Sequence, residues 1–424
     1  MPPVFWPIWP PFWKRLCVCC APRVRPPDPT PGARYGFHSE RRTKTDDRNR
    51  PQGGRGLGPD YWRQHDADKA FPSECWQAIC DAGLAGAMLP EELGGAGLGM
   101  VEVALIIEEL CAGGAGATLA QVFMLNPIFG GVSVAKYGTD QMKRDWLPKM
   151  CSGEMQFCMA LTEPDAGTNS LELRTTAVAD SGGWRLNGQK IWITGVPQSQ
   201  KMLVVARTTP VDQSPKKTRG ISLFMIDTDR EGVSYTAIDK LGTNTLSSSQ
   251  VYFDNVHVRA DELIGDVDKG WHQLLDVLNT ERIVTTAGLV GAGRLAIRLG
   301  VDYAKERRVF GTTPIGAYQS IQFPLAQHWA ELEAAKLLNL KAASLFDHGV
   351  PFGSESNAAK LIASQAASAV AERAMQVMGG MGFAKEMHAE RLWRDARLFR
   401  FAPVSEEMIL NYIATANLGL PRSY

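Results

Sequence analysis

The segment ALTEPDAGTNS, at residues 160–170, places two hydroxyl groups and a glycine within a few positions of one another. Thr162 and Thr168 can each donate a hydrogen bond to a carbonyl or phosphate oxygen. Gly167 has no Cβ atom, so the backbone there can approach a ligand closely. Turns of this composition are common, and the segment by itself is weak evidence for a binding site.

A second segment whose residue types could bind a ligand, LNGQKIWITG, follows at residues 186–195. Trp192 offers an aromatic plane and Thr194 offers a hydroxyl, a combination that suits the face and the edge of a flat heterocycle. The alternative is a tryptophan in a core beside a threonine at a strand end. For either motif alone, this second interpretation is the favoured one.

The elements that must position these residues change in type along the chain. Over residues 71–150 apolar side chains recur at helical spacing, as in FPSECWQAICDAG, where Gly83 is expected to end the helix. Over residues 158–266 the period shortens to two. This predicts strands in KMLVVART, GISLFMID and SSQVYFDNVHV, and turns at 182–183 and 187–188.

After residue 270 the helical period returns in three long runs. Gly349 is expected to end the second run, and Gly379 with Gly380 the third. The chain is thereby divided into four parts. We expect an atypical extension over 1–58, an N-terminal helical domain over 59–155, a middle β domain over 156–267 and a C-terminal helical bundle over 268–424.

Composition limits the classes of function. Lys and Arg together number 45, as do Asp and Glu, so the basic excess of a nucleic-acid-binding protein is not found. No apolar run approaches the roughly 18 residues of a membrane span, and we expect none. The eight cysteines form no C-x-x-C set with a histidine partner. This pattern predicts reduced thiols and no metal site.

The N-terminal 58 residues differ from the rest in being dense in Pro, Trp and Arg, and we expect them to be poorly ordered. Lys14, Arg15, Arg23 and Arg25 all precede the first acidic residue, which leans toward an organelle transit peptide. Ser is scarce, however, and Pro interrupts any amphipathic helix. A disordered or atypical extension is therefore favoured over a transit peptide.

Taken together and in this order, the two motifs resemble the acyl-CoA dehydrogenase family. The resemblance extends to PEELGGAGLG at 90–99, ERRVFG at 306–311, the Tyr318–Gln319 pair and QVMGGMGF at 376–383, and so covers about residues 60–424. It implies FAD as the cofactor. It also implies a mainly α fold, with an N-terminal helical domain, a central β-barrel domain and a C-terminal four-helix bundle. The order of elements read from periodicity agrees with this fold.

By resemblance, the FAD-binding residues form two groups. One group surrounds the flavin ring, with Thr194 donating toward the edge where hydride arrives, and comprises Leu161, Thr162, Gly167, Thr168, Trp192, Ile193 and Thr194. The other group lies at the pyrophosphate and adenosine. In it, a neighbouring subunit supplies Arg307, Phe310 and Gln319, which implies a homodimer or homotetramer. The adenosine part is contacted by Gln376, Val377, Met378, Gly379 and Gly380, and two further positions that touch FAD in the family are Ser405 and Glu407.

The implied reaction needs a base, because the α-proton of a thioester is only weakly acidic. In most of the family this base is a Glu before Gly-Thr near the C-terminus. Here alignment through residues 394–397 places Pro403 at that position, and proline has neither a titratable group nor an N–H. A branch that includes isovaleryl- and long-chain-type enzymes takes its base from an L-x-x-E-R segment of the long helix. The segment at 278–282, LNTER, matches that pattern.

Glu281 is therefore the expected catalytic base. Helical spacing places it on a mostly apolar face of small residues, together with Leu274, Leu278, Thr285 and Gly288. Such surroundings would raise its pKa and suit a base. The alternatives are a surface Glu281 in a salt bridge, or a base at Glu406 or Glu407. By resemblance, the substrate is bound by Thr168, Asn279 and Arg282.

The resemblance implies α,β-dehydrogenation of an acyl-CoA to the 2-enoyl-CoA, as in fatty-acid β-oxidation, with electrons passed to an electron-transfer flavoprotein. Acyl-CoA oxidases and flavin monooxygenases share the fold and use oxygen directly, but a monooxygenase needs no base such as Glu281. A third possibility is an inactive FAD-binding homologue, suggested by Pro403 and the N-terminal extension. The family implies the mitochondrial matrix in a eukaryote and the cytoplasm in a bacterium.

Overall fold

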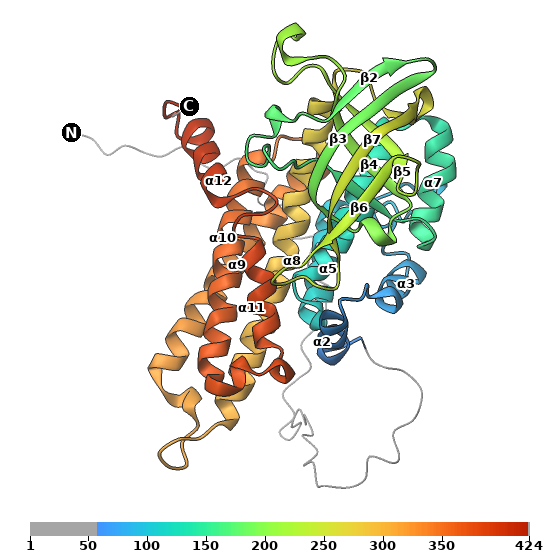
Figure 1. The fold of residues 1–424 in the computed structure, drawn as a ribbon. Coiled ribbons are helices and arrows are strands. Elements are labelled where there is room, and N and C mark those ends of the chain that lie inside the picture. Colours follow the sequence, from blue (N-terminus) through green and yellow to red (C-terminus); the bar gives the residue numbers. More distant parts are fainter. Residues whose placement is uncertain (1–56, 423–424) are drawn as a thin grey trace, which may run out of the picture. The chain divides into compact units, whose positions relative to one another are not determined.

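A computed structural model describes residues 57–422, so the predicted extension and transit peptide fall almost entirely outside the described residues. Helices, a sheet and a helical bundle follow one another along the chain, in the predicted order (Figure 1). The described residues belong to one compact unit. The divisions expected near residues 155 and 267 therefore stay predictions.

The first part of the fold is helical. Its α-helices are α2 (Pro59–Asp68), α3 (Ser73–Asp81), α4 (Met100–Leu110), α5 (Thr118–Phe123), α6 (Ser133–Tyr137) and α7 (Asp140–Ser152). Two π-helical segments, Cys111–Ala115 and Met124–Val132, lie among them. Gly83 follows the end of α3 with φ of 73°, as expected for a glycine that ends a helix. The buried side chains of this part, such as Trp76 and Ile107, share one core with residues of the later helix α8.

The middle part is one eight-stranded sheet. Its strands are β1 (Phe157–Ala160), β2 (Thr176–Asp180), β3 (Gly183–Thr194), β4 (Lys201–Arg207), β5 (Ile221–Asp227), β6 (Val233–Ile238), β7 (Ser248–Arg259) and β8 (Leu263–Ile264). The spatial order is β6-β7-β3-β2-β4-β5-β8, and β1 pairs with β4. Over residues 57–422, β6 and β8 end this order without pairing to each other. The sheet is therefore open, and a closed β-barrel is not observed.

One of the two predicted turns is wrong. The chain reverses at 181–182 between β2 and β3, as expected, but Asn187 and Gly188 lie inside β3, where its register against β7 shifts. The Asn187 side chain accepts a hydrogen bond from the Asn255 amide, 2.8 Å away. Gly188 has φ of 150°, and a Cβ atom there would lie 2.5 Å from the Thr175 hydroxyl. A tightly packed β-bulge thus produces the Asn-Gly signal.

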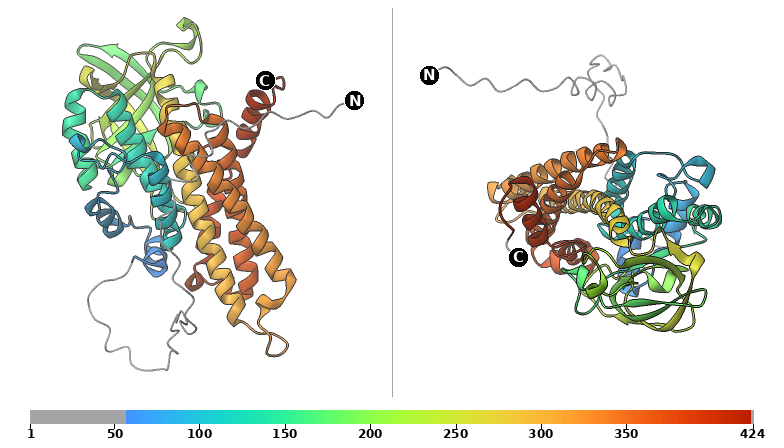
Figure 2. Two further views of the ribbon diagram at one scale, coloured as in Figure 1. Left: turned by 180° about the vertical axis from the view of Figure 1, so that it is seen from behind. Right: turned by 90° about the horizontal axis from the view of Figure 1, so that it is seen from above.

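The C-terminal part is a bundle of long helices, α8 (Gly270–Glu306), α9 (Gln319–Asp347), α10 (Gly353–Met378) and α11 (Ala389–Leu398), with α12 (Glu406–Tyr412) beyond them. Figure 2 shows α8, α9 and α10 side by side. Glycines let α8 approach its neighbours. A Cβ on Gly288 would lie 2.3 Å from Ala120 of α5, and one on Gly293 would lie 2.6 Å from Leu332 of α9.

Two helical stretches of the described chain are long and apolar enough to cross a membrane by length and composition, Thr118–Tyr137 and Gly270–Glu306. The sequence analysis predicts no membrane-spanning stretch. In the most apolar 18-residue window of each stretch, 83 % and 78 % respectively is buried inside the protein, and buried core helices pass the same test. The absence of a membrane span stays a prediction.

Candidate active site

Trp192 is held on the sheet in an unusual backbone conformation. It lies where the pairing of β3 with β7 shifts register between Lys190 and Ile193, and its φ is 61°. Left-handed backbone is rare for a bulky residue and tends to persist at functional sites. The indole is 54 % exposed. The bulge therefore turns a large aromatic face outward, where a flat ring can stack on it, rather than into the core.

Two hydroxyl groups lie beside Trp192. Thr194 and Ser248 are cross-strand partners at the ends of β3 and β7, and their Oγ atoms are 3.1 Å apart. Ile193, between Trp192 and Thr194, is 2 % exposed and belongs to the core of the sheet. Its side chain points away from these groups, so only its backbone can face a ligand on the Trp192 side.

The ALTEPDAGTNS segment is attached to β3 by a buried ion pair. Lys190 Nζ donates to Glu163 Oε1 at 2.8 Å and to the Leu161 carbonyl at 2.9 Å. The Ile191 amide donates to the Thr162 carbonyl at 2.9 Å. These contacts bring the two sequence motifs side by side.

Glu163, the first acidic residue of the motif, has its carboxylate bound within the protein. Its carboxylate also accepts from the amides of Arg174 and Thr175. Burial alone would raise its pKa, but the Lys190 ammonium and these hydrogen bonds lower it overall. Glu163 is thus a fixed anion rather than a proton acceptor.

Gly167 and Thr168 lie on the exposed turn that follows Glu163. A Cβ atom on Gly167 would meet no atom within 4 Å, so nothing in the described chain requires a glycine there. The space beside this backbone is open to a ligand. The structure therefore attaches the loop that carries Leu161, Thr162, Gly167 and Thr168 to β3, which carries Trp192 and Thr194.

Glu281 lies in the interior on α8, with 2 % exposure. No hydrogen bond or ion pair to its carboxyl group is found among residues 57–422. The alternative prediction, a surface Glu281 in a salt bridge, is therefore wrong. Burial raises its pKa to about 8, against the opposing charges of Arg282 and Lys360. A buried carboxyl group without a partner is costly in a stable fold, and such groups cluster at functional sites.

This raised pKa predicts a pH-dependent gain in stability for Glu281→Gln. The folded-state pKa of about 8 exceeds the ordinary 4.5. Between these two pH values the folded protein therefore retains a proton that the unfolded chain releases. Stability therefore falls as pH rises through the window. Glutamine has no such proton. At about pH 9 the free energy of unfolding of the variant should exceed that of wild type by a few kcal/mol, on the order of one per pKa unit, and at about pH 4 the two should be equal.

Urea unfolding of wild type and variant at both pH values measures this effect. An equal difference between the two proteins at both pH values would contradict a titration of Glu281.

The other two carboxylates considered as bases occupy different surroundings. Glu406 is paired with Arg400 and accepts from Ser364 and Gln365 of α10. Burial acts to raise its pKa, but Arg400 and these hydrogen bonds lower it overall. Glu407 is exposed in the first turn of α12. Neither shares the isolated, buried setting of Glu281.

The segment between α11 and α12, which contains Pro403, is held by a buried lysine. Lys360 of α10 has no exposed surface, and its Nζ donates to the carbonyls of Phe399 at 2.6 Å and Val404 at 2.7 Å. Pro403 itself is exposed. Ser405 caps α12, accepting from the Met408 amide at 3.3 Å. The segment is therefore fixed by a cation, and it carries no carboxyl group at position 403.

A separate cavity of about 430 Å³ lies at the junction of the α8 and α10 C-terminal ends. Its lining includes six of the predicted FAD residues, namely Arg307, Gln376, Val377, Met378, Gly379 and Gly380. A Cβ atom on Gly379 or Gly380 would meet nothing within 4 Å, so the glycines leave open space in the cavity. Such a cradle, with one guanidinium, fits the phosphates and adenosine of a dinucleotide.

Phe310, on the loop between α8 and α9, and Gln319, at the start of α9, are not part of the lining of this cavity. Phe310 is fully exposed and has φ of 55°. Gln319 is exposed at the first position of α9. Both side chains project from the chain rather than into it.

Asn279 and Arg282 flank Glu281 on α8. Arg282 donates from Nη1 to Asn279 Oδ1, and its buried Nε has no partner in the described part of the chain. The pair thus presents an unused donor next to the candidate base.

Sequence reasoning missed Lys190, Ser248 and Lys360, which hold the predicted residues in place. A serine and two lysines carry no signal of their own, because lysine is rarely buried and each contact joins distant positions. Only Lys190 lay inside a motif, where it could have been paired with the acid of the neighbouring motif.

Comparison with known proteins agrees with this geometry. Three family models match the chain: "Acyl-CoA dehydrogenase, N-terminal domain" over residues 58–154, "middle domain" over 158–256 and "C-terminal domain" over 268–418. Acyl-CoA dehydrogenase FadE12 of Mycobacterium tuberculosis is 42 % identical over 370 residues, which cover 86 % of this chain and 94 % of that protein. The mitochondrial short-chain specific acyl-CoA dehydrogenase of Homo sapiens is 35 % identical over 336 residues, or 79 % and 80 % of the two chains.

Solved structures show the same likeness. A glutaryl-coenzyme A dehydrogenase in complex with glutaryl-CoA superposes with a TM-score of 0.82 at 29 % identity, covering 86 % of this chain and 92 % of that one. Butyryl-CoA dehydrogenase from Megasphaera elsdenii gives 0.79 at 28 % identity, covering 85 % and 96 %. With these matches, the chain belongs to the acyl-CoA dehydrogenase family and is an FAD-dependent oxidoreductase.

Proposed function

We propose that this protein removes two hydrogens from the α and β carbons of an acyl-CoA thioester, with Glu281 as the base. The observation that carries the proposal is the buried, unpaired Glu281 carboxyl on α8. Such a group can accept the α-proton without first breaking a salt bridge. FAD, when bound, supplies the acceptor for the hydrogen that leaves the β carbon.

The sheet residues orient the flavin ring. Trp192 offers the exposed indole face, and Leu161 and Thr162 lie on the segment after β1, which Lys190 and Ile191 hold against β3. Thr194 would present its hydroxyl to the edge of a bound flavin ring, and Thr168 would contact the flavin and the acyl-CoA. The nearly complete burial of Glu281 keeps water away from the reacting carbons, which strengthens the electrostatic effect of every nearby dipole.

The thioester end of the substrate lies beside Glu281 in this proposal. Asn279 and Arg282 are on the same helix within one turn of the base, and the unpaired Arg282 Nε can donate to an oxygen of the acyl-CoA. Pro403 cannot contribute the amide that most relatives use near the carbonyl, so the chain depends on other donors there.

Two copies of the chain are needed for one FAD site. Glu281 and Arg307 are separated by continuous helix, since α8 ends at Glu306, and the rise along it is about 40 Å. One FAD molecule cannot reach from the flavin position near Glu281 to the cavity at Arg307 of the same chain. We therefore assign Arg307, Phe310, Gln319 and Gln376–Gly380 to the FAD of a neighbouring subunit in a homodimer or homotetramer. The full exposure of Phe310 supports this.

We also propose an electron-transfer flavoprotein as the acceptor, and a location in the mitochondrial matrix or bacterial cytoplasm according to the source organism. The Glu281 base favours α-proton chemistry over monooxygenation. It does not by itself separate a dehydrogenase from an acyl-CoA oxidase.

Anaerobic titration of the purified yellow protein with butyryl-, isovaleryl-, glutaryl- and longer acyl-CoAs tests the proposal. Bleaching of the flavin absorbance by at least one thioester is expected, followed by fast reoxidation with an electron-transfer flavoprotein and slow reoxidation with oxygen. Fast reoxidation by oxygen alone would identify an oxidase. A protein that retains FAD but is bleached by no thioester would overturn the proposed reaction.

A further inference from the structure

The direction of one hydroxyl proton decides what Thr194 can do. Thr194 Oγ and Ser248 Oγ are 3.1 Å apart, and either oxygen can be the donor. If Ser248 donates to Thr194, the Thr194 proton is free to point toward a ligand. If Thr194 donates to Ser248, its proton is used within the protein. Oxidised flavin carries an acceptor nitrogen at the edge where hydride arrives, so only the first arrangement gives it a hydrogen bond.

A third residue selects between these arrangements. Lys240, in the loop between β6 and β7, donates from Nζ to Ser248 Oγ at 3.1 Å, to Thr243 Oγ1 at 3.0 Å and to the Leu246 carbonyl at 2.6 Å. An ammonium group has three protons and no lone pair, so it can only donate. Its three protons are all engaged, and Ser248 must accept from it.

The Ser248 proton then has one destination. Ser248 is 4 % exposed, and within residues 57–422 its only neighbour that can accept is Thr194 Oγ. Ser248 therefore donates to Thr194, and the Thr194 proton is left to point outward. The order of donation runs from Lys240 through Ser248 to Thr194, which lies beside the exposed Trp192.

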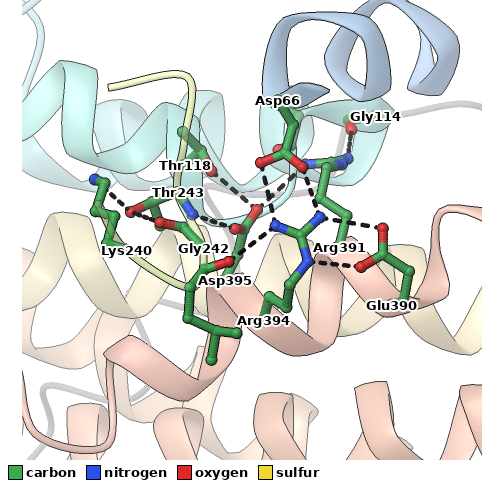
Figure 3. A network of polar contacts seen from close by, with 12 residues as sticks. Asp66, Gly114, Thr118, Lys240, Gly242, Thr243, Glu390, Arg391, Arg394 and Asp395 are labelled. Carbon is green, nitrogen blue, oxygen red and sulfur yellow. Dashed lines mark hydrogen bonds and ion pairs between the residues drawn. The ribbon is translucent and has the colours of Figure 1, made fainter. Parts of the chain in front are cut away.

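The loop that carries Lys240 is fixed by a buried network (Figure 3). The Thr243 amide donates to Asp395 of α11 at 2.5 Å, and the Thr118 hydroxyl donates to the same carboxylate at 3.0 Å. Arg394 donates to the Leu241 carbonyl at 3.1 Å. Thr243 and Asp395 are each 1 % exposed. The position of Lys240 is thus set by the sheet, by α5 and by α11 together.

The charge state of Lys240 also matters for this order. Burial lowers its pKa to about 8, while Asp395 and Asp66 act to raise it. Arg394 of α11 donates to the Leu241 carbonyl of the same loop, and the neighbouring Asp239 is paired with Lys69. Below about pH 8 the amine is an ammonium and can only donate. Above it, Nζ gains a lone pair that can accept from Ser248, and the order of donation can reverse.

We propose that Lys240 is a positioning residue that acts through Ser248 to direct the Thr194 hydroxyl proton at the flavin edge. The inference rests on the proposed function, which places the oxidised flavin against Thr194. It goes beyond that function in giving a role to a loop lysine that touches neither flavin nor substrate.

The test uses the FAD-loaded full chain with flavin labelled at the acceptor nitrogen, whose NMR resonance responds to hydrogen bonding. Lys240→Met should move this resonance toward that of a flavin without a donor at this atom. It should also slow reduction of the bound flavin by acyl-CoA about tenfold, less than the hundredfold or more for losing a direct donor, because Thr194 remains. Ser248→Ala removes the competing acceptor, so the Thr194 proton should stay at the flavin and the resonance should remain near that of wild type. The double variant should therefore resemble Ser248→Ala rather than Lys240→Met.

The pH series separates Lys240 from Glu281. In wild type, raising the pH through about 8 should move the resonance in the same direction as Lys240→Met, while the variant, which keeps Glu281, should not show this step. Lys201→Met, which removes a lysine paired with Asp227 elsewhere on the sheet, controls for loss of a partly buried charge. Thermal unfolding of each variant reports any loss of fold.

An unchanged resonance in Lys240→Met would overturn the inference. A double variant whose resonance stays shifted as in Lys240→Met would also overturn it, since the lysine would then act by charge alone. If Lys240→Met fails to fold, the pH series still tests the hydroxyl order: the step near pH 8 should be present in wild type, and its persistence in Ser248→Ala would overturn the inference. Failure of the proposed function is distinct, because wild type itself would then not be bleached by any thioester.

Discussion

Glu281→Gln is expected to slow anaerobic bleaching of the flavin by acyl-CoA about 10³-fold or more while FAD stays bound. Glutamine keeps the shape of the side chain and removes the proton acceptor, and general base catalysis is typically worth two to four orders of magnitude. Stopped-flow absorbance at saturating acyl-CoA measures the rate constant. In wild type the rate should rise with pH toward about 8, because ionisation of Glu281 creates the base.

Three further variants sharpen this result. Glu281→Asp keeps the carboxyl group but withdraws it by one methylene, and should retain more activity than Glu281→Gln. Glu406→Gln and Glu407→Gln should leave the rate within a few-fold of wild type. Bleaching that survives Glu281→Gln and disappears in one of the other two would move the base to the C-terminal segment. FAD content, measured on each denatured variant, confirms that the cofactor is present.

Lys190→Met is expected to destabilise the fold by about 3–5 kcal/mol, because it leaves the Glu163 carboxylate buried without its cation. Lys190 has no exposed surface and Glu163 is 5 % exposed, so water cannot replace the lost partner. Urea unfolding at neutral pH measures the change. The loss should shrink in acid, where Glu163 takes up a proton and no longer leaves a buried charge.

The matched variant for this prediction is Lys201→Met, whose partner Asp227 is more accessible and is also bound by Arg230. We expect Lys201→Met to lower the free energy of unfolding by about 1 kcal/mol or less. Adding Glu163→Gln to Lys190→Met should recover part of the loss. Equal costs for Lys190→Met and Lys201→Met would mean that the buried pair contributes no more than a partly exposed one.

The sequence predicted the order of elements and the environment of Glu281 because both follow from periodicity. The three long helices and the strands at 201–207, 221–227 and 248–259 lie where the repeat of apolar residues places them. Of the face expected around Glu281, Leu274, Thr285 and Gly288 are buried, and Leu278 is half-buried. Local pattern determines which side of an element is buried.

Features that depend on long-range contacts could not be predicted in the same way. The Asn187–Gly188 pair is typical of both a turn and a β-bulge. The pairing of β3 with β7 determines that it forms a bulge. Ile193 alternates with its neighbours, but the register shift at Trp192 determines that Ile193 faces the core. Whether a sheet closes depends on its edge strands, which no local window contains.

The C-terminal segment shows how one departure is accommodated. The family resemblance predicts a carboxylate where this chain has Pro403, and the segment here is held by the Lys360 ammonium and by the Arg400–Glu406 pair. A carboxylate at position 403 would be close to the cation that anchors this segment. The sequence revealed the substitution, but the lysine that organises the segment is 43 residues earlier in the chain.

The length of α8 between Glu281 and Arg307 has a genetic consequence. In the proposed oligomer each flavin site takes its base from one chain and its phosphate-side residues from another, so two different defective alleles are expected to complement each other. In a dimer mixed from a Glu281 variant and an Arg307 variant, one site collects both defects and the other collects neither. Co-expression of two inactive genes should then restore active sites that neither gene produces alone.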